Sequence, residues 1–408
     1  MISKKIYELK EKMERYIEEN NLKAGDRLPS ETALASLFEQ MVNGPVKNYF
    51  TVSDQTILET KDGETQDSLN GKFLELTQML GKPHTKTFLV DKGPTNNFWN
   101  YSLKLQIPGT DRAMFMEFRD SAGEFFEAGG AHSKETNDYV SECDVFVIIV
   151  DTPYLMGCNE EESKELCTEA INLGTNRIND IHGFLTNIND NDGQDAKMVV
   201  FVPLKCEKWA KEGRIDEVTA RIKTVYEKTI KALSAYKKMT IGIIPIETAG
   251  NILFSEFKDA YTITGKIGGT KRCCKISETI VRLEDGTPKK IKDTDIINED
   301  DKAVISGTSL MRPYAWYNIN PNDPSYAPKN CEQLPLHILH FMFGKYKEIE
   351  AKKEKGGIFS FLKGLWDRIC AVFGKIKIDE LDKILTKMRT DGIIKNSGDG
   401  IEYIQKCY

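Results

Sequence analysis

The sequence predicts an α/β fold with a mostly parallel sheet and helices on both of its faces. Three short runs rich in β-branched residues support this prediction: 145–150, 198–203 and 240–245. Runs of this kind are typical of strands that are buried on both faces. Helical patterns near 160–185 and 212–237 separate these runs. Repeated strand–helix units form parallel sheets, because each connection returns to the same edge of the sheet.

The composition is that of an ordinary globular protein. The chain has 408 residues, of which 40% are hydrophobic and 29% charged, and this length allows two or three domains. The net charge of −6 argues against a surface that binds nucleic acid throughout, but it leaves room for a local basic patch. Nine scattered cysteines without a CxxC pair favour reduced thiols. With no signal-peptide pattern and no long apolar run, we expect a cytoplasmic protein without a membrane span.

Local patterns predict further elements in the first third of the chain. Apolar residues recur at helical spacing in 1–20 and in 31–39, and Ser30 is a suitable N-cap for the second of these helices. Residues 99–107 and 113–119 alternate between apolar and polar on either side of a Pro-Gly turn. This alternation predicts a β-hairpin.

The C-terminal third is predicted to be more irregular. Residues 264–305 are rich in Gly, Lys and Asp and indicate an inserted loop or small hairpin. Residues 333–344 indicate a last packing helix, and 345–357 a charged linker. Residues 358–373 are strongly amphipathic, and 376–404 indicate a helix followed by a hairpin.

Two motifs at predicted strand ends have residues suited to binding phosphate and metal. Asp120 directly follows a strand, where its carboxylate could hold Mg²⁺ through water. Gly123, three residues later and followed by Glu124, would allow a backbone N–H to approach a γ-phosphate. The next strand, 144–151, begins and ends with aspartate at the separation expected for one strand–helix unit.

Two later motifs have residues suited to binding a purine base. A carboxylate can accept hydrogen bonds from N1–H and N2–H₂ of guanine, while a lysine packs along the ring. Glu207 and Lys205 have these types and a suitable spacing after the second strand of the sheet. Thr248 and Ala249 follow the third strand, where a backbone N–H would reach the guanine oxygen.

Taken in order, these motifs resemble those of translation-factor-class GTPases, and more closely the bacterial domains called double-GTPases. Residues 120–124 (DSAGE) resemble the DxxG motif, and 204–207 (LKCE) resemble a variant of NKxD. Residues 247–254 (ETAGNILF) and 314–343 also look like that group. The resemblance covers about two-thirds of the chain. It implies a P-loop-NTPase-like sheet, with Mg²⁺ and GTP or GDP as ligands and Asp120 as the metal residue.

The sequence departs from that family at the phosphate loop. The family needs GxxxxGK[ST], whose backbone N–H groups and lysine hold the β- and γ-phosphates. Gly-Lys pairs begin at 71, 81, 265, 344 and 374, and none is followed by Ser or Thr. Because phosphate contacts supply most of the affinity and the catalytic electrostatics, hydrolysis is not expected. The leading hypothesis is a degenerate GTPase-like switch or scaffold, nucleotide-dependent or nucleotide-free, that binds an unidentified protein partner.

Residues 22–38 resemble the first half of the GntR-family winged helix-turn-helix. No recognition helix follows them, but 381–404 shows a helix, a glycine stop and a short hairpin, the pattern of a recognition helix plus wing. The alternative function is therefore a GntR-type DNA-binding regulator with a GTPase-like sensor domain. Its DNA-binding candidates are Arg27, Ser30, Lys383, Lys387 and Arg389. The charges at both ends are balanced, so a packing module without DNA contact and a rearranged gene also stay open.

These interpretations divide the chain into four parts. The predicted parts are a GntR-like partial helix-turn-helix (1–40), a GTPase-like α/β domain (41–345) with an insertion at about 264–305, a charged linker with an amphipathic helix (346–374), and a winged-helix-like element (375–408). The helix at 358–373 is expected to pack against the core or a partner, with membrane-surface contact as the weaker alternative. His337 and His340 fit core histidines better than metal ligands.

Overall fold

The computed structural model describes eleven segments: 30–52, 99–106, 113–120, 143–186, 196–267, 270–277, 280–282, 288–291, 304–319, 325–354 and 378–408. The helices predicted at 1–20 and 358–373, and with them the membrane-surface hypothesis, lie outside these segments. Among the described helices, none combines the length and hydropathy that a membrane crossing requires.

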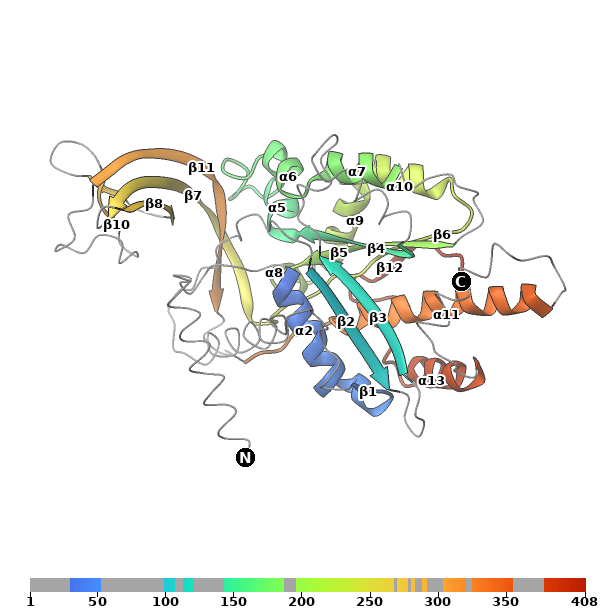
Figure 1. The fold of residues 1–408 in the computed structure, drawn as a ribbon. Helices are drawn as coiled ribbons and strands as arrows, with labels where there is room; N and C mark the ends of the chain where they lie inside the picture. The colour runs from blue at the N-terminus through green and yellow to red at the C-terminus, as the bar shows by residue number, and fades with distance from the viewer. Residues whose placement is uncertain are drawn as a thin grey trace, which may run out of the picture.

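A four-stranded sheet forms the centre of the molecule (Figure 1). Its parallel strands are β4 (Val145–Asp151), β5 (Lys197–Leu204) and β6 (Met239–Ile243), and the antiparallel β12 (Glu402–Gln405) pairs with β6. The strand order is β12–β6–β5–β4. The prediction of a mixed α/β fold with a mostly parallel sheet is therefore confirmed, whereas a specific P-loop fold stays a prediction.

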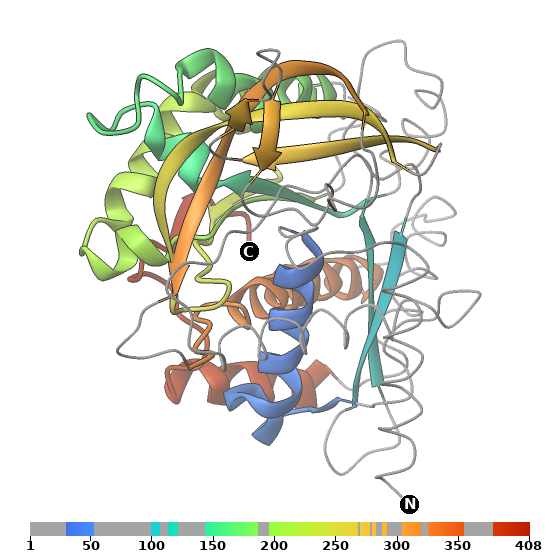
Figure 2. The ribbon, with the colours of Figure 1, turned by 90° about the vertical axis from the view of Figure 1, so that its left-hand side faces the viewer.

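The side chains of the central strands alternate between two hydrophobic cores. In β5, Val199 and Phe201 lie in one core, while Met198, Val200 and Val202 lie in the other. This period of two arises because successive side chains of a strand point to opposite faces. Helices cover both faces, as predicted, with α5–α10 on one side and α2, α11 and α13 on the other (Figures 1 and 2).

The helices on the first face are shorter than the sequence pattern predicted. The bounds are α5 (Thr152–Gly157), α6 (Glu169–Thr175), α7 (Ile178–Thr186), α8 (Glu207–Lys211), α9 (Ile215–Val225) and α10 (Glu227–Ser234). The helix predicted near 212–237 is interrupted at Tyr226, whose buried hydroxyl donates to the backbone oxygen of Asn176, 3.1 Å away. This tertiary contact accompanies the break and is invisible in a local pattern.

The opposite face brings the two ends of the described chain together. Its elements are α2 (Ser30–Asn43), the short 3₁₀ helix η1 (Pro45–Asn48), α11 (Gln333–Glu354) and α13 (Ile378–Thr390). Apolar side chains of α2 and α13 are buried in the same core cluster. Just after η1, the hydroxyl of Tyr49 donates to the carboxylate of Asp391, and Lys387 of α13 lies 5.6 Å from the Tyr49 ring centroid.

Helix α11 continues through the predicted linker. The charge-rich stretch 345–357 indicated a solvated connection, but the helix extends to Glu354. The reason is tertiary, because its charges have partners on other elements. Lys345 is buried against Asp144 at 2.6 Å, and Lys238 approaches Glu348 to 2.8 Å. The linker prediction is therefore wrong for the described residues 345–354.

The predicted C-terminal wing is also corrected. Residues 402–405 form β12 and pair with β6 of the central sheet, so they do not make a separate hairpin. Lys223 of α9 pairs with Glu402 at 2.9 Å, which ties this strand to the helical layer. The short strand pattern was recognised correctly, but its pairing partner is more than 150 residues away in the sequence.

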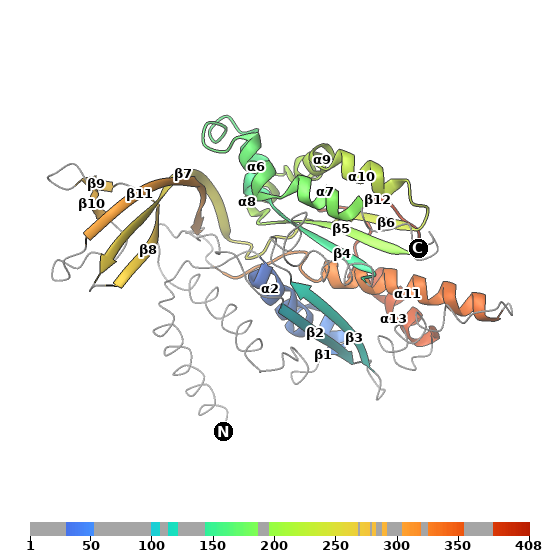
Figure 3. The same ribbon diagram turned by 45° about the horizontal axis from the view of Figure 1, so that its top comes forward.

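The hairpin predicted at 99–107 and 113–119 is confirmed as β2 (Trp99–Gln106) and β3 (Ala113–Asp120). With β1 (Thr51–Val52) these strands form a separate antiparallel sheet of order β1–β2–β3. The hairpin lies beside α2 in Figures 1 and 3. Among the described strands, β3 and β4 do not pair, so the hairpin does not extend the central sheet.

A long antiparallel sheet replaces the loop or small hairpin predicted at 264–305. Its strands are β7 (Ile252–Ile267), β8 (Thr270–Ser277) and β11 (Val304–Ile319), in the order β11–β7–β8. Nearby, β9 (Ile280–Arg282) pairs with β10 (Pro288–Ile291). We call β7, β8, β9, β10 and β11 the arm, since they extend away from the central sheet in Figures 1 and 3. The base of the arm is buried in the helix-side core through Phe254, Phe257, Ala315 and Tyr317.

Two histidines of α11 lie in the interior, as the sequence indicated. The Nδ1 atom of His337 lies 2.5 Å from the Tyr403 hydroxyl of β12, so this pair ties α11 to the edge of the central sheet. Burial lowers the pKa of His337 to about 4, and nearby Lys406 and Arg389 act in the same direction. Burial likewise lowers the pKa of His340 to about 3.

This burial predicts a stability loss in acid. The unfolded chain protonates His337 near pH 6.5, whereas the folded chain resists until about pH 4, so stability falls as the pH drops below 6.5. We expect the wild type to lose about 1 kcal/mol more than a His337→Gln variant between pH 7.5 and 5.5. Urea unfolding at both pH values measures the difference. Equal losses in the two proteins would mean that His337 is not held neutral.

Candidate functional site

Polar residues gather where the parallel strands β4, β5 and β6 end. Asp151 is the last residue of β4, Lys205 follows β5, and Glu207 begins α8. The loop 247–250 follows β6, and Ile246 just before it bridges to Leu204 at the end of β5. Ligands of α/β proteins bind at this edge of the sheet, because loops after parallel strands converge there.

The first pair in this site is Lys205 with Asp151. The Lys205 Nζ lies 2.6 Å from Asp151 Oδ2, and the two side chains are only 12% and 11% exposed. The same Nζ is 5.6 Å from the ring centroid of Tyr317 in the arm. Lys205 has a φ of 60°, a left-handed conformation that costs a non-glycine residue about 1–2 kcal/mol. The lysine predicted to pack along a base is thus held by a carboxylate within the protein.

The second contact joins Glu207 to the loop after β6. The Glu207 Oε1 accepts hydrogen bonds from the backbone N–H groups of Ala249 at 2.8 Å and Gly250 at 3.3 Å. Glu207 is only 2% exposed. Burial raises the pKa of its carboxyl group to about 7, even though the two N–H bonds oppose this rise. The carboxylate and the loop N–H predicted to recognise guanine therefore bind each other.

The loop is fixed from its other side as well. The buried hydroxyl of Ser36 in α2 donates to the backbone oxygen of Thr248 at 2.8 Å. Ala327 donates its N–H to the Ala249 oxygen at 3.0 Å. Gly250 has a φ of 80°, and a Cβ added there would lie 1.9 Å from the Ala327 oxygen. Only glycine fits at this position, which explains the Ala-Gly pair in the sequence.

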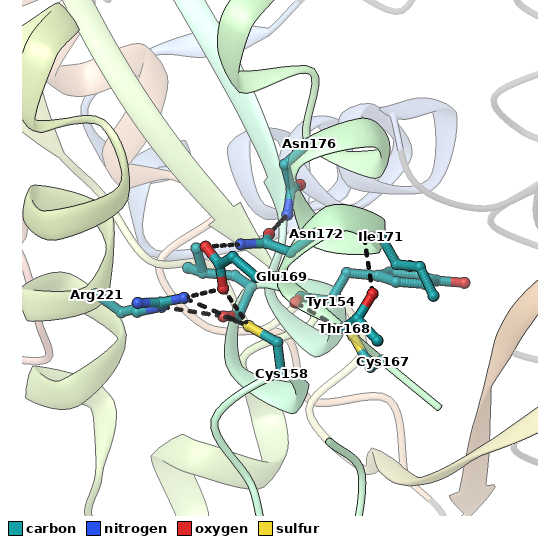
Figure 4. Close-up of polar contacts among 10 residues, drawn as sticks. Tyr154, Cys158, Cys167, Thr168, Glu169, Ile171, Asn172, Asn176 and Arg221 are labelled. Carbon is teal, nitrogen blue, oxygen red and sulfur yellow. Dashed lines mark hydrogen bonds and ion pairs between the residues drawn. The ribbon is translucent and has the colours of Figure 1, made fainter. Parts of the chain in front are cut away.

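A network of side chains holds the Asp151 backbone (Figure 4). Asn176 accepts from the Asp151 N–H at 2.7 Å, and its amide reaches Asn172 Oδ1 at 2.9 Å. Asn172 donates to Glu169 at 3.3 Å, and Glu169 pairs with Arg221 of α9 at 2.5 Å. The site is therefore braced across α6 and α9. Sequence reasoning missed this network, because asparagines scattered over a helix carry no recognisable motif.

The remaining candidates are placed as follows. Asp120 is the last residue of β3, and Ser30 is the first residue of α2. Gly123, Glu124 and Arg27 lie outside the described residues. On α13, Lys383 is exposed, Lys387 lies over Tyr49 and Arg389 is half-buried. The proposed role of α13 in DNA binding stays a prediction.

The described side chains contain no group of three or more His, Cys, Asp or Glu residues that could hold a metal ion. The donor set at the strand ends also fits guanine poorly in this arrangement, since Glu207 and Ala249 satisfy each other. Comparisons with protein-family models, curated proteins and solved structures found no match to this chain. The function must therefore be argued from the site itself.

Proposed function

We propose that this chain is a GTPase-like scaffold whose base-recognition loops are closed on each other without nucleotide, and which acts by binding another protein. The observation that carries the proposal is the double hydrogen bond from Ala249 and Gly250 to the buried carboxylate of Glu207. A guanine base would need the same acceptor and the same N–H donor. The loops thus form a finished internal contact in place of a receptive site.

Energetics support this proposal. Hydrogen bonds to a charged acceptor contribute about 1.5–3 kcal/mol each, so an entering base must first replace interactions of that size. Nucleotide-binding proteins offset such costs mainly through contacts to the phosphates. This sequence contains no GxxxxGK[ST] loop to make them. The balance favours the internally closed state over a nucleotide complex.

Calorimetry with GTP and GDP in the presence of Mg²⁺, and with ATP as control, tests the proposal. We expect no binding of any of the three at concentrations up to about 1 mM, because internal contacts already occupy the base site and phosphate contacts are missing. Micromolar, guanine-specific binding that is lost in Glu207→Ala would contradict the proposal. Such a result would show that Glu207 releases its loop to read the base.

A further inference from the structure

The arm has a charge distribution unlike that of the whole chain. Beyond its buried base, the described strand residues between 258 and 314 include one acidic residue, Asp259. They include nine basic residues: Lys258, Lys266, Lys271, Arg272, Lys275, Arg282, Lys289, Lys290 and Arg312. The connections between these strands carry eight carboxylates in the sequence, so charge along this part of the chain is segregated by element. The net charge of −6 hides this basic segment.

The strand register concentrates the positive charge. Lys266 of β7 lies directly opposite Lys271 of β8, and Lys275 is opposite Thr262. Like charges directly opposite each other destabilise an antiparallel pair unless a counter-charge neutralises them. Lysines on an edge strand such as β8 also prevent pairing with other chains. That explanation does not extend to Lys266, which lies in the middle strand of the sheet.

The shape of the arm suits a long, regularly charged partner. Strands β7 and β11 each have 16 residues, which at about 3.3 Å per residue corresponds to roughly 50 Å. The arm extends away from the central sheet (Figures 1 and 3). Antiparallel ribbons are among the few elements that enter a nucleic-acid groove, and lysine and arginine along them pair with phosphates.

We propose that the arm binds nucleic acid through contacts between its basic strands and the phosphate backbone. The inference does not depend on the proposed scaffold function, because it uses none of the residues at the strand-end site. It also differs from a GntR-type interaction, which would use α2 and α13. Backbone phosphate is shared by DNA and RNA, so the test includes both.

Fluorescence anisotropy of the full chain with a labelled 25-base-pair DNA duplex and the corresponding RNA duplex tests this proposal. We expect binding by the wild type that weakens steeply between 50 and 200 mM KCl. Replacing Lys271, Arg272 and Lys275 with glutamine should weaken binding at least about tenfold and reduce the salt slope by about 2–3, since each lost phosphate contact contributes about 0.9. DNA and RNA bound to similar extents would indicate backbone recognition, and preference for one would identify the natural form.

Three further variants control this experiment. Replacing the exposed Lys228, Lys231 and Lys237 with glutamine changes the net charge equally and should leave binding unchanged. Lys271→Arg with Lys275→Arg keeps the charge and should keep binding, which guards against an arm that merely misfolds. Lys383→Gln with Lys387→Gln tests α13. The proposal is overturned if the arm and control triple variants lose equal affinity, if only the α13 variant loses binding, or if neither duplex binds at 50 mM KCl.

Discussion

A Glu207→Ala variant is expected to lose about 3 kcal/mol of unfolding free energy, because the truncation leaves two buried backbone donors without an acceptor. The N–H groups of Ala249 and Gly250 both bind the Glu207 carboxylate. An unsatisfied buried donor costs about 1–3 kcal/mol, and the cavity left by the side chain adds to this. Urea unfolding followed by circular dichroism measures the loss.

The pH dependence of the same residue gives a second readout. The folded pKa of Glu207 is raised to about 7 from 4.5, so its favourable contribution is complete below pH 4.5 and declines as the pH rises through 7. Glu207→Gln keeps an acceptor for the loop and cannot ionise. Relative to this variant, we expect the wild type to lose about 1–3 kcal/mol between pH 5 and pH 8.

Glu212→Ala is the matched control for Glu207→Ala. Glu212 ends the same short helix but is exposed, and its partner Arg214 keeps two other carboxylates. We expect this variant to change stability by less than about 0.5 kcal/mol. If Glu207→Ala were equally mild, the Glu207 carboxylate would not hold the loop, and the closed-site proposal would fail with it.

A Lys345→Ala variant is expected to be at least as damaging, with a loss of about 2–4 kcal/mol. The Lys345 side chain is 2% exposed, and its Nζ lies 2.6 Å from Asp144 Oδ1 and 3.1 Å from the Ala196 oxygen. The substitution removes a buried aliphatic stem and leaves a partly buried carboxylate without its partner. Breaking a buried pair is costly for this reason, although the 26% exposure of Asp144 moderates the loss.

The same helix offers a close control for the Lys345 experiment. Lys347 also forms an ion pair at 2.6 Å, with Asp382, but these side chains are 44% and 50% exposed. Exposed pairs contribute little, so Lys347→Ala should cost less than about 1 kcal/mol. Adding 1 M KCl should weaken the Lys347 contribution and leave most of the Lys345 contribution, since salt screens buried pairs less. Equal losses in the two variants would refute the structural role of Lys345.

The two charged stretches that the sequence analysis misjudged show where local reasoning stops. Residues 345–354 contain many charges, and a charged stretch is usually solvated. Whether such a stretch is a linker or a helix depends on partners elsewhere, here Asp144 and Lys238. In the same way, the Gly- and Lys-rich composition of 264–305 concealed strands whose pairing connects β7 with β11 over about fifty residues. Composition does not record such pairings.

The candidate site shows the same division. Its location could be predicted, because Lys205, Glu207 and Ala249 each follow a recognisable buried strand, and the ends of parallel strands converge. That Glu207 would bind the loop and not a ligand could not be predicted, because a carboxylate suits either role. Ser36 was interpreted as part of a DNA-binding helix, yet its hydroxyl binds the Thr248 backbone.

The sequence by itself determined the α/β class, the three parallel strands, the β2–β3 hairpin and the strand ends at which the polar residues gather. These features follow from the local periodicity of apolar residues, which reports which side of each segment is buried. Only the tertiary structure decided that β12 joins the central sheet, that α11 continues beyond residue 344, and that Glu207 and its loop close on each other. The physical reason is that hydrogen bonds and ion pairs depend on which partner arrives from a distant part of the chain, and a local pattern contains no information about that partner.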